Sequence, residues 1–291
     1  MLFFQAMPQC PYDWWFRAGF EYTGCLTFAL IAIFIFGSCW GSFMNVCIWR
    51  MPRRESVVTA PSHCTSCGAD IHWYDNLPVI SYIVLRGRCR ACHTPYSCRY
   101  FIVEIIMGLL FCAVFIKVGL TQQVPGVIAP YWILLLFAVA AGWIDAKHRI
   151  IPDALNYPAM LLGVICAGLL PEVWGTKTWY LAVIYSLISG AVPGILLALF
   201  AYFGEKITGK EVLGWGDVKF ITACGTLLGL PGAFFVLLSG SLAGSIGGTL
   251  WILCRKKKLA GSSIAFGPFL ASGAVLWVFV GTWFYPLVLI L

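Results

Sequence analysis

The stretch CLTFALIAIFIFGSCWGSFMNVCI, residues 25–48, contains no charged side chain. It is long enough to cross the hydrocarbon core of a bilayer as one helix, which takes about 20 apolar residues. A cleavable signal peptide has a shorter apolar core and a basic start, whereas Asp13 and Glu21 precede this run. We therefore predict a retained transmembrane helix at 25–48, preceded by an N-terminal stretch of residues 1–24.

The same pattern continues along the 291-residue chain, of which 60% is hydrophobic and 11% charged. A soluble domain has about 25% charged residues, so this composition and the mean hydropathy of +0.87 indicate a membrane protein. We predict an all-α polytopic fold of about eight spans. The third and sixth are short, and Pro231-Gly232 leaves little room for a turn. The expected spans are 25–48, 100–118, 131–146, 154–170, 179–203, 217–230, 232–253 and 265–289.

The net charge of +7 lies in the connections between these spans, which is typical of topology signals and not of a nucleic-acid-binding surface. With eight spans, all but three of the 19 basic residues fall on one side of the membrane. The exceptions are Arg17, Lys117 and Lys177. The positive-inside rule predicts that the rich side is cytoplasmic and that both termini face outward.

The only sizeable polar segment, residues 49–98, holds two Cys-x-x-Cys pairs and is here called the cysteine loop. The pairs are Cys64 with Cys67 and Cys89 with Cys92. Two such pairs provide four thiolates, the ligand set of a closed, structural zinc site. Two disulfides or four free thiols are the alternatives, which a reducing cytoplasm disfavours. We therefore predict a small cytoplasmic zinc-binding subdomain.

Two aspartates stand at the predicted cytoplasmic ends of spans, where acidic residues are rare because a charge in lipid is costly. Asp145 ends the third span, and Asp217 begins the sixth in the sequence GWGD, residues 214–217. Two close carboxylates share one proton, so one can activate a water while the other protonates a peptide carbonyl. Gly214 and Gly216 would allow a substrate backbone or a neighbouring helix to approach. Alternatively, each aspartate is an interfacial partner of Lys147 or Lys219.

The sequence resembles the bacterial type IV prepilin peptidases, which also process type II secretion pseudopilins. The resemblance extends from about residue 37 to the last span. It is carried by the cysteine loop and by GSFMNV (41–46), RMP (50–52), NLPVISY (76–82), LRGRC (85–89), RY (99–100), VE (103–104), ID (144–145), IPD (151–153), TGKE (208–211), GWGDVK (214–219) and FGPF (266–269).

This resemblance implies an inner-membrane aspartyl peptidase that removes a short basic leader on the cytoplasmic side. The catalytic pair would be Asp145 and Asp217. Gly214, Gly216 and Lys219 would support the catalytic loop that carries Asp217. Many members then methylate the new N-terminus with S-adenosyl-L-methionine, an activity associated with the cysteine loop. The chain would thus consist of residues 1–24, a helix at 25–48, the loop at 49–98 and a peptidase core at 99–291.

Gly87 and Glu104 are candidates for the methyl-transfer site, on the same resemblance. Glu104 lies inside the second span, where it could contact the new amine or the methyl donor; a structural polar contact, for example with Arg99, is the favoured interpretation. Three other functions remain open at this point. They are an ion-coupled transporter using both aspartates, a zinc-loop membrane scaffold, and a related peptidase with another substrate.

Overall fold

The computed structural model describes residues 23–58, 62–120, 124–254 and 265–288, and these contain helices but no strands. Most of the predicted N-terminal stretch and the basic residues 255–258 lie outside the described residues. The long helices are α2 (Thr23–Arg50), α4 (Arg99–Leu120), α5 (Ile128–His148), α6 (Asp153–Leu169), α7 (Trp179–Thr208), α8 (Trp215–Cys254) and α9 (Gly267–Val288). The short ones are η1 (Met51–Arg53), η2 (Trp73–Asn76), α3 (Ile80–Val84), η3 (Pro125–Val127) and η4 (Pro171–Trp174).

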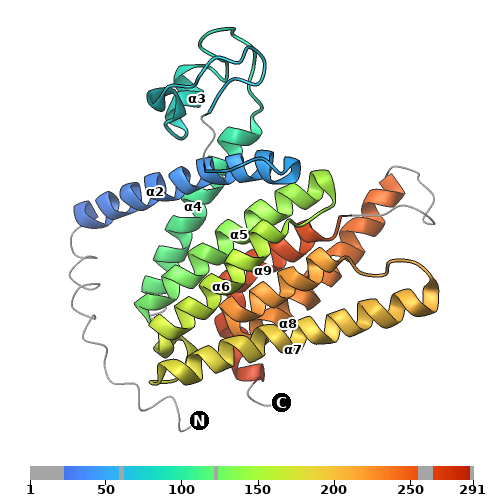
Figure 1. Cartoon of the computed structure of the whole chain (residues 1–291). Helices are drawn as coiled ribbons and strands as arrows, with labels where there is room; N and C mark the ends of the chain where they lie inside the picture. The colour runs from blue at the N-terminus through green and yellow to red at the C-terminus, as the bar shows by residue number, and fades with distance from the viewer. Residues whose placement is uncertain (1–22, 59–61, 121–123, 255–264, 289–291) are drawn as a thin grey trace.

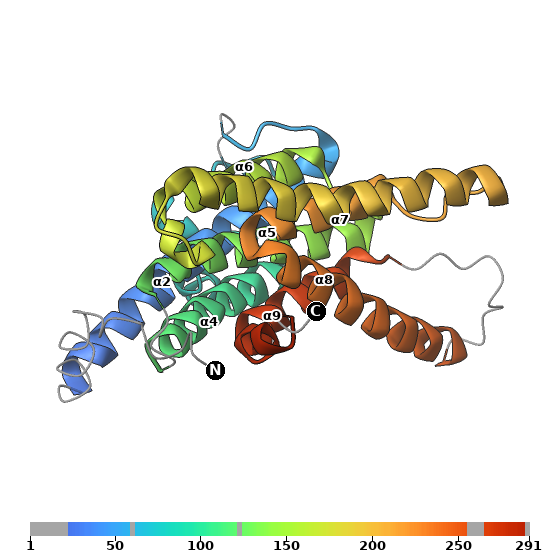
Figure 2. The ribbon, with the colours of Figure 1, turned by 90° about the horizontal axis from the view of Figure 1, so that it is seen from below.

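Helix α5 lies at the centre of the molecule, because it contacts α2, α4, α6, α8 and α9. Leu134, Ala138, Ala141 and Ile144 on α5 are all fully buried. In Figure 2, α2 projects from one side of the molecule and the C-terminal part of α7 from the opposite side. A side chain on α5 therefore lies in the interior of the bundle along most of the helix.

Five of the described helices are long and apolar enough to cross a membrane. They are α2, α4, α5, α7 and α8, while α6 and α9 are shorter apolar helices. Their outer faces remain apolar: Leu187, Ile188 and Ile195 on α7 are each about half exposed, as expected for side chains that face lipid. The chain is thus a multi-pass membrane protein.

The sixth and seventh predicted spans correspond to α8, which consists of two helical arms joined at a non-helical residue. Gly229 adopts φ 79° and ψ 174°, which only glycine reaches readily, and Pro231 follows two residues later. The break lies slightly before the Pro231-Gly232 turn that the sequence suggested. Figure 1 shows the helix axis changing direction there, so the two predicted spans correspond to two arms of α8.

The cysteine loop stands at one end of the bundle, between the C-terminus of α2 and the N-terminus of α4 (Figure 1). The C-terminus of α5 lies at the same end, because the Lys147 ammonium lies 5.9 Å from the Trp49 ring centre. Tyr82 in the loop stacks on Phe101 of α4, with ring centres 5.0 Å apart. The loop is therefore packed against the helices and is not a free appendage.

Candidate active site and zinc centre

Asp145 lies in the last turn of α5 and is 6% exposed. Its Oδ2 accepts a hydrogen bond of 2.8 Å from the backbone N–H of Gly267, the first residue of α9. Helix α5 ends three residues later, where Arg149 takes a left-handed conformation and donates its N–H to the Asp145 carbonyl. Pro152 then precedes α6. The Asp145 carboxyl group is thus held by two helices.

Asp217 lies in the first turn of α8 and is partly buried. A Cβ on Gly214 would lie 3.2 Å from Asp217 Oδ2, and one on Gly216 would lie 3.2 Å from Ile151 Cβ. The sequence predicted that these glycines allow a close approach. At Gly216 the approaching group is the segment that joins α5 to α6, and at Gly214 it is the aspartate's own carboxyl group.

The GWGD segment therefore brings the start of α8 against the end of α5. Asp145 and Asp217 are close enough for their charges to interact, and exposed Glu211 also acts on Asp217. Lys219 does not pair with either of them: it donates a hydrogen bond of 2.7 Å to Asp153 at the start of α6. This bond joins the first turns of α6 and α8 beside the two aspartates. The two carboxyl groups thus lie at the same end of the helices, where the charge of Asp145 acts on Asp217.

The two Cys-x-x-Cys segments adopt the same backbone conformation. In the first, Cys64 N donates to Ala69 O at 2.8 Å and Gly68 N donates to Cys64 O. In the second, Cys89 N donates to Thr94 O at 2.9 Å and His93 N donates to Cys89 O. The residue after each pair has positive φ: 73° at Gly68 and 58° at His93. Such paired turns point both thiols of each segment to one side, as a zinc knuckle requires.

The four thiols fit a tetrahedral zinc ion. Their sulfur atoms all lie within 4.8 Å of one another, and Cys64 Sγ lies 3.8 Å from Cys92 Sγ. Zinc–sulfur bonds of 2.3 Å place sulfur atoms about 3.8 Å apart in a tetrahedron. All four cysteines are free and not joined in disulfides. Zinc binds cysteine as the thiolate, and the backbone N–H of Cys92 and the Tyr96 hydroxyl favour that form at Cys89.

Glu104, on α4, is buried and anchors the cysteine loop to the helices. Its Oε2 accepts a hydrogen bond of 2.8 Å from the Val79 N–H, and Ser42 of α2 also bonds to it. Val79 has φ 64° and ψ −50°, a strained conformation for a β-branched residue. Glu104 therefore makes a structural polar contact, which was the favoured interpretation of the sequence. Its partners are Val79 and Ser42, and not Arg99. The sequence offered no signal for these partners, because they are 25 and 62 residues away from Glu104.

Gly87, the other methyl-transfer candidate, forms the turn between α3 and the second cysteine pair. Its φ is 65°, and a Cβ there would lie 2.8 Å from the Tyr82 ring. Gly87 N donates to Tyr82 O, and Tyr96 N donates to Gly87 O. Any side chain at position 87 would therefore displace Tyr82 and the turn that positions Cys89.

We expect Glu104→Ala to loosen the cysteine loop, because it leaves the part-buried Val79 N–H without its acceptor. The cost is about 1–3 kcal/mol of local stability, whereas Glu104→Gln keeps an acceptor and costs less than about 1 kcal/mol. Tryptic cleavage at the loop arginines measures this opening, and it should become roughly tenfold faster in the alanine variant alone. If the glutamine variant lost methyl transfer while its loop stayed protease-resistant, Glu104 would be a chemical group and not an anchor.

These features define a class of protein: a multi-pass membrane protein with two neighbouring carboxyl groups at the end of its helices that carries a four-cysteine subdomain. Within that class, the chain belongs to the type IV leader peptidase family, whose model matches residues 132–249. The model of the bacterial peptidase A24 N-terminal domain matches residues 35–118, which include the cysteine loop.

Similar proteins carry the name prepilin leader peptidase/N-methyltransferase. The protein of Myxococcus xanthus (strain DK1622) is 36% identical over 226 residues, which cover 77% of this chain and 64% of that protein. That of Xanthomonas campestris pv. campestris is 31% identical over 254 residues, 79% of this chain and 84% of the relative. That of Stutzerimonas stutzeri is 31% identical over 284 residues, 87% and 91% of the two chains. No solved structure matches the chain.

Proposed function

We propose that this protein removes the basic leader peptide from type IV prepilins and type II secretion pseudopilins, with Asp145 and Asp217 as the catalytic pair. The observation that carries this proposal is the pairing of two interacting carboxyl groups, one buried and one partly buried, where α5 ends and α8 begins. The family and the names of the similar proteins support peptide cleavage as the reaction. They do not favour the transporter or the scaffold.

In this reaction the pair holds one proton between its two carboxyl groups. The ionised group removes a proton from a water, whose oxygen attacks the peptide carbonyl. The protonated group gives its proton to the carbonyl oxygen, which forms a tetrahedral intermediate. The intermediate then collapses as a proton passes to the leaving nitrogen, and this releases the leader's new carboxyl group and the pilin's new amine. No metal is required at this site.

The charge distribution supports a cytoplasmic position for the site in the bacterial inner membrane. Arg50, Arg53 and Lys147 gather at the end of the bundle where the cysteine loop and Asp145 lie, as the positive-inside rule requires. Both termini would then face the periplasm. Glu205 and Glu211 are exposed and lie shortly before Asp217, so their negative charge would attract a basic leader.

With this topology, different parts of the chain would have different roles. The helix at 25–48 and the peptidase core at 99–291 would form the membrane part, which receives the apolar helix of the substrate by packing. The cysteine loop at 49–98, held by zinc, would form the methyl-transfer part.

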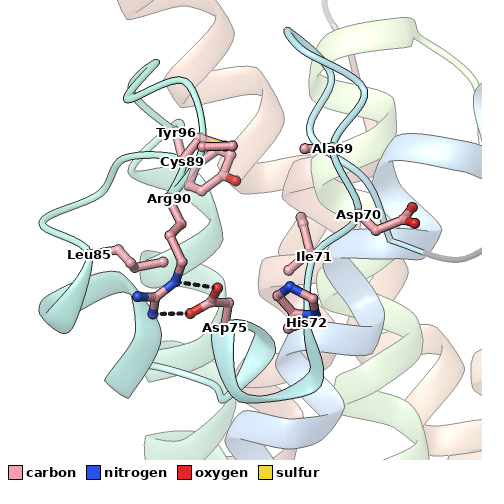
Figure 3. A pocket seen from close by; sticks show the side chains of 10 residues that line it. Ala69, Asp70, Ile71, His72, Asp75, Leu85, Cys89, Arg90 and Tyr96 are labelled. Carbon is pink, nitrogen blue, oxygen red and sulfur yellow. Dashed lines mark hydrogen bonds and ion pairs between the residues drawn. The ribbon is translucent and has the colours of Figure 1, made fainter.

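A cavity of about 350 Å³ in the cysteine loop supports the second activity, methylation of the new N-terminal amine. It lies between residues 69–72 on one side and Leu85, Cys89 and Arg90 on the other (Figure 3). Its volume is within the range of small-molecule sites. We propose that S-adenosyl-L-methionine, which supplies an electrophilic methyl group when bound, occupies this cavity.

The chemistry of the lining suits such a ligand. Ile71, Leu85 and Tyr96 provide apolar and aromatic surface for a purine ring. Asp75 contributes carboxylate oxygens to the lining, and the Arg90 guanidinium bound to it holds the pKa of that carboxyl below its usual range. Arg90 binds Asp75 through two hydrogen bonds, Nε to Oδ2 at 2.7 Å and Nη2 to Oδ1 at 2.5 Å. This pair closes one end of the cavity in Figure 3.

Replacing Arg90 with alanine should raise the KM for S-adenosyl-L-methionine about tenfold, because the Asp75 carboxylate loses the partner that orients it. Leader cleavage should stay within twofold of wild type. The matched control is Arg88→Ala, which removes an exposed arginine that does not line the cavity. Equal effects of the two substitutions on KM would argue against a donor site in this cavity.

The main proposal is tested with purified protein in nanodiscs and a full-length prepilin. Gel shift and mass spectrometry should show loss of the leader, followed by one added methyl group when S-adenosyl-L-methionine is present. A wild-type protein that leaves the prepilin intact under these conditions would contradict the proposal.

A further inference from the structure

The contact between Asp145 and α9 reaches a part of the chain that the family models do not match. Gly267 lies beyond residue 249, where the match to the leader peptidase family ends. Its N–H nevertheless donates to Asp145 Oδ2 at 2.8 Å, across 122 residues of sequence, in a buried position. The first N–H groups of a helix have no partner within the helix, and a carboxylate is well suited to accept from them.

The packing at this contact leaves no room for a side chain at position 267. A Cβ on Gly267 would lie 2.7 Å from Asp145 Oδ2, 2.8 Å from Asp145 Cβ and 2.9 Å from Asp145 Cγ. All three distances are shorter than real Cβ contacts. Asp145 itself is buried in the central helix, so its carboxyl group has little freedom to move away without leaving its present rotamer.

The neighbouring contacts fix the position of the start of α9 relative to α5. One turn further into the bundle, a Cβ on Gly142 would lie 2.9 Å from Ala271 Cβ, so α5 and α9 touch through small residues. On the other side, a Cβ on Gly240 of α8 would lie 2.8 Å from Leu270 Cδ2. The start of α9 is thus wedged between α5 and the second arm of α8, which places the Gly267 amide against the Asp145 carboxyl group.

We propose that Gly267 is a positioning residue for the peptidase reaction, which orients the Asp145 carboxyl group through its amide and by the absence of a side chain. This inference rests on the proposed role of Asp145. Helix α9, through this amide, fixes the plane of the Asp145 carboxyl group relative to Asp217. Oδ2 is held by the amide, and Oδ1 is the oxygen directed to the reacting water. Glycine at 267 is then required for turnover and not only for folding.

The test compares Gly267→Ala with Gly273→Ala in the full-length protein in nanodiscs. Gly273→Ala is the matched control: its Cβ would lie 2.6 Å from Ser239 Oγ, so it crowds α9 against α8 without touching the carboxyl group or the contact with α5. Displacing a catalytic group by about 1 Å can cost about 100-fold in rate. We expect Gly267→Ala to lower kcat for prepilin cleavage 10- to 100-fold with KM within threefold, while Gly273→Ala keeps kcat within threefold.

Methyl transfer to a pilin that already lacks its leader reports whether each variant is folded, and it should stay within twofold of wild type. Should Gly267→Ala lose this activity too, an ester in place of the Phe266–Gly267 peptide bond removes the N–H without adding an atom. It should lower kcat about tenfold. Normal kcat in the ester variant, or in a folded Gly267→Ala variant, would overturn the inference, as would an equal loss in Gly273→Ala.

Measuring Asp145→Asn in the same assay distinguishes a wrong catalytic pair from a wrong role of Gly267. If Asp145→Asn cleaves normally, the proposed catalytic pair is wrong and Gly267 has nothing to position. If Asp145→Asn is inactive while Gly267→Ala turns over normally, the catalytic pair stands and only the role of Gly267 is wrong.

Discussion

Asp145→Asn and Asp217→Asn should each lower the rate of leader cleavage by at least about 1,000-fold, while the protein still inserts and folds. Asparagine has nearly the same shape as aspartate, so the packing around α5 and α8 is retained. What is lost is the ability to take up or release a proton, and both carboxyl groups are needed because one acts as the base and the other as the acid. The measurement is kcat/KM for a prepilin in nanodiscs, followed by mass spectrometry of the product.

The matched control is Asp153→Asn, which changes a third aspartate at the same end of the helices. Asp153 is exposed and paired with Lys219, and an exposed pair of this kind contributes at most about 1 kcal/mol. We expect its cleavage rate to remain within fivefold of wild type. Full cleavage by either of the other two variants would show that a different group activates the water. Methyl transfer to a pre-cleaved pilin should persist in all three variants.

The second large effect concerns the zinc centre. The double substitution Cys64→Ser and Cys89→Ser, one ligand from each pair, should reduce bound zinc from about one ion per chain to nearly none. Structural zinc sites contribute about 10–16 kcal/mol to the folding of small zinc-finger peptides. The cysteine loop has few buried apolar side chains of its own: of its described residues, Cys64 and Cys89 are its buried hydrophobic ones. Without the metal, the loop should therefore unfold locally.

Zinc content by elemental mass spectrometry and tryptic cleavage at the exposed Arg86, Arg88 and Arg90 provide two readouts that do not depend on activity. We expect cleavage at these arginines to become at least about 100-fold faster in the double variant. Cys98→Ser is the control, since Cys98 is exposed and lies outside the cluster. Zinc retained by the double variant, or a disulfide between these cysteines in protein from a reducing cytoplasm, would refute the zinc assignment.

Local patterns in the sequence were sufficient for the architecture. Apolar runs of the length of a bilayer predicted the helices, because a membrane span must satisfy its own backbone hydrogen bonds and expose an apolar surface. The Cys-x-x-Cys spacing predicted the four-sulfur cluster, because two residues between ligands form a complete turn. The choice of Asp145 and Asp217 also came from local context, although their catalytic role remains a prediction.

Other features depend on how distant segments pack. Glu104 was singled out, but its partner Val79 became known only when the loop was seen against α4. FGPF was noticed as a motif without a role, and the role proposed for Gly267 comes from its contact with a residue 122 positions away. The cavity in the cysteine loop is likewise formed by segments that the four-cysteine cluster brings together.

The division has a physical reason. Helix formation and span length are governed by neighbours within a few residues, so the sequence by itself determined the helices, the cysteine ligands and the two candidate aspartates. The sixth and seventh spans show the limit: composition predicted a break near Pro231, and the backbone places it at Gly229. Which groups touch Asp145, Glu104 and Asp75 was decided only by the tertiary structure, because close packing selects one arrangement of helices among many that the same apolar surfaces permit.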